Sequence, residues 1–195
     1  MNTILQNVNT EMIKQGKTLS EACNWNRVSE SIDDMKYVRT YANIHPWDWE
    51  SLSRNPYFEM EDALQLKDDY PLVWGQYGLS MNPSQFLLIK HYPDEFDWFW
   101  GLGGVSSNRG IILEFIEEHS ERLDFRMGGV SSMPCITLQF VLKHPEYPWF
   151  WGEYGLSTFL DVSPKDVEAH PDLPWNYEAL EKNRFYVKHT KSLAL

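Results

Sequence analysis

The stretch FWGLGGVSSNRG at residues 99–110 decides the fold, because its centre returns in DFRMGGVSSMPC at residues 124–135. Both copies of GGVSS contain an aliphatic residue followed by serine. On both sides of this stretch, the pair recurs along the chain at spacings of 24 to 27 residues, which is typical of a repeat architecture. We call its aliphatic member the anchor. The pairs are Val28-Ser29, Leu52-Ser53, Leu79-Ser80, Val105-Ser106, Val130-Ser131 and Leu156-Ser157, with Leu180-Glu181 as a degenerate seventh.

An aromatic residue stands five positions before six of the seven anchors. The first unit departs from this pattern, with Cys23 at that position and Trp25 two places later. A large ring buries about 150–250 Å². We therefore interpret the series as a structural ladder that fills the core between units, and we predict that Trp100 and Trp151 are largely buried. The ladder is Trp47, Trp74, Trp100, Phe125, Trp151 and Trp175.

The segments between anchors carry helical signals. In ITLQFVLKHPEYP, residues Ile136, Phe140 and Val141 recur at helical spacing, and IILEFIEEH repeats the pattern with Ile112 and Phe115. Asn-Pro before such a run is a helix start, and His-Pro after it is a stop. Glycine precedes four anchors, where we expect a left-handed backbone. These are Gly78, Gly104, Gly129 and Gly155.

A short helical hairpin cannot bury its apolar side alone, so neighbouring units are expected to stack. The predicted fold is all-α, with helical hairpins stacked into an α-solenoid. The alternative is a leucine-rich-repeat-like α/β solenoid, which the missing leucine code and the crowding of Pro and Gly disfavour.

Three segments follow from this interpretation. Residues 1–22, with Leu5, Val8 and Met12 at helical spacing, are expected to form an N-terminal cap. Residues 23–181 are expected to form a repeat domain of about seven units. Residues 182–195 form a basic tail, which we expect to lack a second helix of the usual kind.

Charge and composition exclude several classes of protein. The net charge is −11, and the basic residues of the tail contrast with an acidic body, which argues against a nucleic-acid partner. No apolar run is long enough to cross a membrane, and the N-terminal sequence MNTILQNVNTEMIKQ does not resemble a secretory signal. Two cysteines are too few for a disulfide framework.

We expect no catalytic, cofactor or metal site. The histidines recur once per unit, and packed helices lie about 8–10 Å apart, so neighbouring units cannot share a zinc ion easily. Cys135 lies where a helix start could stabilise a thiolate, but a small buried side chain is the favoured interpretation. The paired glycines lack the Lys and Ser/Thr of a phosphate loop.

Contacts with other proteins are the better functional candidate. Paired rings in short segments cannot all point inward, and exposed aromatic groups beside an acidic surface favour a protein partner with basic segments. The candidate partner contacts are Trp49, Trp98, Tyr154, Tyr177, Lys182, Arg184, Lys188 and Lys191.

The segments PWFWGEYGLS, HPWDWESLSRNP and CITLQFVLKHPEYPW resemble the tryptophan-rich repeats of proteins from giant and other large DNA viruses. The resemblance covers about residues 23–183 and departs from the pattern at Phe125, where tryptophan is expected. It implies a viral protein found in the virion or in the infected-cell cytoplasm, and it implies no enzymatic activity.

The expected function is a non-enzymatic repeat scaffold that makes protein-protein contacts, as a minor capsid-associated or assembly protein whose partners include virion subunits. Two alternatives stay open. One is a host-directed adaptor that binds a cellular partner, and the other is an enzyme whose site no motif reveals.

Overall fold

The chain is all-α. The computed structural model describes residue 4 and residues 6–193, with the backbone alone for residues 191–193. Helices and short 3₁₀ turns, joined by loops, make up this range. It contains no strand, and an isolated bridge joins Val8 to Cys23. The predicted helical class is confirmed, and the α/β alternative is disfavoured. The chain divides into two compact units, Met1–Phe99 and Trp100–Leu195, each described by itself.

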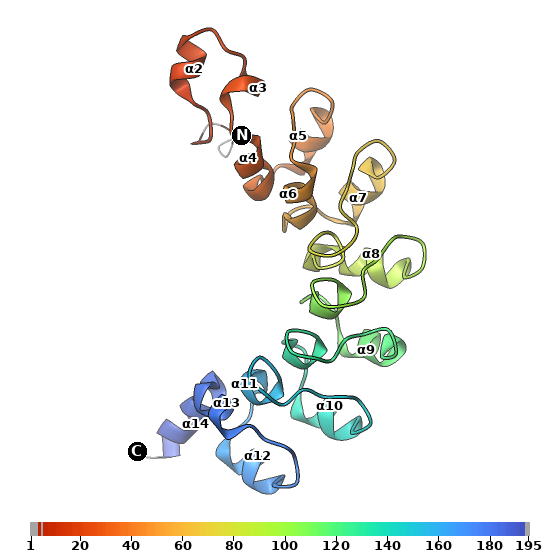
Figure 1. The fold of residues 1–195 in the computed structure, drawn as a ribbon, viewed down its shortest axis with the longest axis vertical. Coiled ribbons are helices and arrows are strands. Elements are labelled where there is room, and N and C mark those ends of the chain that lie inside the picture. Colours follow the sequence, from red (N-terminus) through yellow and green to blue (C-terminus); the bar gives the residue numbers. More distant parts are fainter. Residues whose placement is uncertain (1–3, 5, 194–195) are drawn as a thin grey trace. The chain divides into compact units, whose positions relative to one another are not determined.

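In the first compact unit, α2 packs on α3, and two later pairs join helices two places apart. Helix α4 packs on α6, and α5 packs on α7 (Figure 1). The elements are α2 (Thr10–Lys14), α3 (Leu19–Ala22), α4 (Trp25–Ser31), α5 (Met35–Thr40), α6 (Trp49–Arg54), α7 (Met60–Leu66), η1 (Pro83–Gln85) and α8 (Phe86–His91).

The second compact unit follows the same plan. Helix α11 packs on α13, and α12 packs on α14 (Figure 1). Its elements are η2 (Val105–Ser107), α9 (Leu113–His119), η3 (Val130–Ser132), α10 (Leu138–Lys143), α11 (Leu156–Phe159), α12 (Pro164–Ala169), α13 (Tyr177–Lys182) and α14 (Arg184–Leu193).

A serine-to-backbone hydrogen bond joins successive repeats. All seven anchors are buried, and so are the six serines that follow them. Each serine hydroxyl accepts a hydrogen bond from a backbone N–H of the next repeat, over 2.7 to 3.0 Å. The donating residues are Asp48, Val73, Phe99, Asp124, Phe150 and Asn176.

These hydrogen bonds correct the ladder predicted from sequence. The residues before the donors form a second series. Trp47, Leu72, Trp98, Leu123 and Trp175 in this series are buried, and Trp149 is half-buried. Predicted members Trp47 and Trp175 keep their places. Trp74, Trp100 and Trp151 are half-buried two residues further on, so the expected burial of Trp100 and Trp151 is only partial. Phe125 is also displaced from the ladder but is itself buried.

The shift has a local cause. In the repeats anchored by Leu52 and Leu180, the donor is a helix N-cap, Asp48 or Asn176, four residues before the anchor. In the four repeats between them, a turn containing glycine lengthens this segment to six residues. The position five residues before the anchor therefore precedes the donor in the repeats with an N-cap and follows it in the repeats with a glycine turn.

The predicted left-handed glycines are displaced by one residue. Positive φ occurs one position earlier, at Tyr77 (57°), Gly103 (79°), Gly128 (77°) and Tyr154 (65°). The glycines next to the anchor serve another purpose. A Cβ at Gly78, Gly129 or Gly155 would overlap the carbonyl oxygen of the residue five positions earlier. Glycine is therefore required there for close backbone approach.

Buried asparagines also join successive repeats. The side-chain amides of Asn55, Asn82 and Asn183 each donate to two carbonyl oxygens of the preceding repeat, over 2.9 to 3.0 Å. Their Oδ1 atoms accept backbone N–H groups further along the chain. The helix-start role predicted for Asn-Pro holds at η1, where Asn82 is the N-cap. Asn55 instead ends α6, so that helix-start assignment is wrong.

The predicted helical faces need small corrections. Helix α10 begins at Leu138, so Ile136 is buried just before it rather than within it. Before α9, Ile112 is exposed and its neighbour Ile111 is buried, because Ile112 occupies the N-cap position with extended backbone.

The ends of the chain also differ from expectation. Leu5 lies outside the described residues, and α2 begins only at Thr10, capped by Asn9, so Val8 is not helical. The tail does form a second helix, α14, because Asn183 Oδ1 accepts the N–H groups of Phe185 and Tyr186 at its start.

Candidate partner-contact surface

Two of the aromatic candidates are exposed. Tyr154 keeps 54% of its surface in water and Tyr177 keeps 64%. Trp98 is 7% exposed and donates its indole N–H to the Tyr92 carbonyl, so its expected exposure is wrong. Trp49 is half-buried and stacks on Tyr70 with 4.3 Å between ring centroids.

Tyr77 was missed by sequence reasoning although it shares the setting of Tyr154. Both lie in the string Gly-x-Tyr-Gly-Leu-Ser, at residues 75–80 and 152–157. Both adopt the left-handed conformation, in which an ordinary side chain costs on the order of 1–3 kcal/mol. Gly103 and Gly128 occupy this position in the repeats between them without that cost. The repeated string was the available signal for Tyr77.

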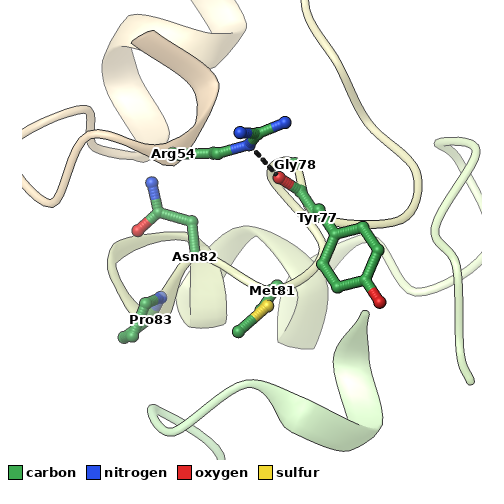
Figure 2. Close-up of a pocket in the computed structure, with 6 residues that line it drawn as sticks. All are labelled: Arg54, Tyr77, Gly78, Met81, Asn82 and Pro83. Carbon is green, nitrogen blue, oxygen red and sulfur yellow. Dashed lines mark hydrogen bonds between the residues drawn. The ribbon is translucent and has the colours of Figure 1, made fainter. Parts of the chain in front are cut away.

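A pocket of about 450 Å³ adjoins Tyr77 (Figure 2). Arg54 Nε donates a 2.6 Å hydrogen bond to the Tyr77 carbonyl oxygen, while the phenol ring points away from Arg54. Met81, 40% exposed, contributes a thioether, and Pro83 lines the pocket as well. A ring, a thioether and a guanidinium can receive an apolar side chain together with a peptide carbonyl group.

The basic candidates divide into three groups. Lys182 and Arg184 line a groove of the second compact unit, where Lys182 Nζ lies 3.0 Å from Glu153 and the Arg184 guanidinium lies 4.5 Å from the Phe185 ring centroid. Lys188 is exposed on α14. For Lys191 the structure gives the backbone only, so its side chain lies outside the described residues.

Cys135 is not activated. Burial raises the pKa of its thiol to about 11, so the thiol stays protonated at neutral pH. The helix that follows begins at Leu138, three residues on, so Cys135 is not at its N-terminus. Cys135 is half-buried, so the expected small buried side chain is only partly withdrawn from water.

Four of the recurring histidines lie at helix C-termini. His91 and His119 end their helices, and His144 and His170 follow theirs as C-caps. The predicted His-Pro stop therefore holds at His144 and His170. In the described part of the chain, no three side chains of the His, Cys, Asp or Glu type gather closely enough to hold a metal ion.

Across the described range, every helix is too short or too polar to cross a bilayer.

No known protein family, no curated protein and no solved structure matches this chain.

Proposed function

We propose that this chain is a non-enzymatic α-solenoid scaffold that works through contacts with other proteins. The hydrogen bonds between the periodic serines and the next repeat carry the proposal. In six of the seven repeats, the hydroxyl of the serine after the anchor accepts a hydrogen bond from the next repeat, so this potential nucleophile has a structural role. Repeats joined in this way each expose an equivalent surface, which suits a binding face built from several repeats.

Exposed tyrosines in a costly backbone conformation support the contact surface. Tyr77 and Tyr154 stay in the left-handed region although glycine serves at the equivalent positions of other repeats. Tyrosine supplies a large, rigid contact area with one polar end, and such residues are enriched at interfaces. Retaining these two rings at a conformational cost indicates a role outside the fold.

The finer assignment rests on the resemblance to viral tryptophan-rich repeats. Under it, the chain is a minor capsid-associated or assembly protein, its partners are virion subunits, and it resides in the virion or the infected-cell cytoplasm. The acidic body favours partners with basic segments.

Site-specific photo-cross-linking in native extract tests the contact surface. A benzophenone amino acid placed at Tyr77 or Tyr154 is expected to cross-link discrete protein partners. The matched controls are Glu118 and Lys165, which are also exposed and lie on the second helix of their repeats. Equal cross-linking at tyrosine and control positions would contradict the proposal, as would turnover of a substrate that depends on one polar side chain.

A further inference from the structure

The second compact unit contains a groove of about 690 Å³ that differs in charge from the rest of the body. Residues of four successive repeats line it, the last of them at the end of α13 and the start of α14. Its basic side chains are Arg109, Lys182 and Arg184, and Asp161 is the one carboxylate among its lining residues. The chain as a whole carries a charge of −11, so a basic groove is unusual on this surface.

Two of the three basic groups are available to a ligand. Among the described residues, no carboxylate lies within ion-pair distance of Arg109 or Arg184. Lys182 forms an ion pair with Glu153. Of the side chains that the structure describes, the nearest basic group to the Asp161 carboxylate is His189, whose Nε2 lies 3.8 Å from Asp161 Oδ1. An unpaired guanidinium offers a planar set of donors that matches a carboxylate in a bidentate geometry.

A hydroxyl of the groove also lacks a partner. Thr158 Oγ1 is withdrawn from solvent and makes no hydrogen bond, although its residue lines the groove. The neighbouring hydroxyls are used, since Ser132 donates to the Gly129 carbonyl and Thr137 accepts from the Phe140 N–H. A buried polar group without a partner costs about 1–3 kcal/mol, and a ligand acceptor would remove that cost.

The remaining lining is apolar. Ile136, Leu138, Phe159 and Phe185 contribute to it, and Phe159 is 39% exposed. A free inorganic anion would leave these side chains in water. A peptide that carries both carboxylate and apolar side chains would cover them.

We propose that this groove binds an extended acidic peptide segment of a partner protein, with its carboxylates on Arg109 and Arg184 and an acceptor at Thr158 Oγ1. This deepens the proposed scaffold function and rests on it. The net charge of −11 opposes the binding of an acidic segment to most of the surface, so electrostatics favour a basic groove. A nucleic acid suits the site less well, because its continuous phosphate charge would extend over the acidic surface on both sides.

The test is fluorescence anisotropy with the full chain and a short fluorescein-labelled peptide of glutamate alternating with phenylalanine and leucine. The proposal predicts saturable binding that weakens with salt. It also predicts a loss of about tenfold or more in the double variant Arg109→Gln/Arg184→Gln, since each 1.4 kcal/mol is tenfold in affinity. The double variant Arg27→Gln/Lys165→Gln removes the same charge outside the groove and is expected to bind normally.

Thr158→Val separates a binding role from a structural one. Valine keeps the shape and removes a hydroxyl that has no partner in the free protein. Peptide affinity should fall severalfold while the melting temperature stays equal or rises. A fall in melting temperature with unchanged affinity would overturn the role of Thr158.

Three further results would overturn the groove assignment: no saturable binding, equal affinity for a glutamine version of the peptide, or tighter binding of a single-stranded oligonucleotide at the same site. If cross-linking at Tyr154 persists while the peptide fails to bind, the groove assignment fails and the scaffold function stands.

Discussion

The backbone N–H of Phe150 donates a 2.9 Å hydrogen bond to the hydroxyl of Ser131, and that hydroxyl donates in turn to the Phe125 carbonyl oxygen over 2.6 Å. One buried side chain thus satisfies backbone groups of its own repeat and of the next. Ser80 likewise accepts from the Phe99 N–H and donates to the Trp74 carbonyl oxygen. Ser106 accepts from the Asp124 N–H and donates to the Trp100 carbonyl oxygen. The periodic serine therefore connects repeats, which explains its place beside a buried anchor in each one.

Replacing Ser131 by Ala should lower the free energy of unfolding by about 1–3 kcal/mol, because the Phe150 N–H loses its acceptor in a buried setting. Urea denaturation measures this change. Ser132→Ala is the control, since that hydroxyl bonds within its own turn and should matter less. Equal losses in the two variants would remove Ser131 from its linking role.

Trp98→Ala should cost about 3–5 kcal/mol, as is usual for a large core ring. Trp100→Ala should cost less, because Trp100 is half-buried and its ring lies under the Arg122 guanidinium, 3.7 Å from the ring centroid. Thermal or denaturant unfolding of the two variants compares them. The ladder predicted from sequence, five residues before each anchor, gives the reverse order. A larger loss of stability in Trp100→Ala than in Trp98→Ala would therefore support that ladder.

Tyr154→Gly should leave the stability unchanged or raise it by about 1 kcal/mol, because glycine adopts positive φ without strain. Tyr177→Gly, at the start of helix α13, should lower stability by a similar amount. Melting temperatures check both signs. A clear loss of stability in Tyr154→Gly would mean that the ring contributes to the fold.

Acid should destabilise the end of the chain that contains His45. Burial lowers the pKa of His45 below its usual 6.5, and its ring stacks on Trp25 and bonds to Tyr37 Oη. Below pH 6.5 the unfolded chain therefore binds a proton before the folded chain does. The stability contribution is complete above that pH and is lost as pH falls through the folded pKa.

Melting curves at pH 7.5 and pH 5.5 measure this loss. His45→Gln keeps a neutral polar side chain and should reduce the difference between the two curves. An unchanged difference would assign the acid sensitivity to other groups.

The repeat, the helical class and the buried anchors could be predicted because each follows from a fixed sequence period. The ladder could not be placed fully, since the segment before the anchor is two residues longer where a glycine turn replaces an N-cap such as Asp48. Exposure of Tyr154 and Tyr177 was predictable from crowding of the rings. The groove was not, because Arg109 and Arg184 lie far apart in the sequence and meet only through the packing of repeats.

The repeat account is tested most directly by removing one whole repeat. Deletion of residues 106–130 joins Val105 to Ser131 and regenerates the string GGVSS without a scar. The account predicts a shorter chain with the same helical circular dichroism per residue and a cooperative melt, because Ser131 takes the place of Ser106. Deletion of residues 106–119, about half a repeat, should instead unfold the chain. Loss of structure in the whole-repeat deletion, equal to that in the half-repeat deletion, would contradict the stacked-repeat account.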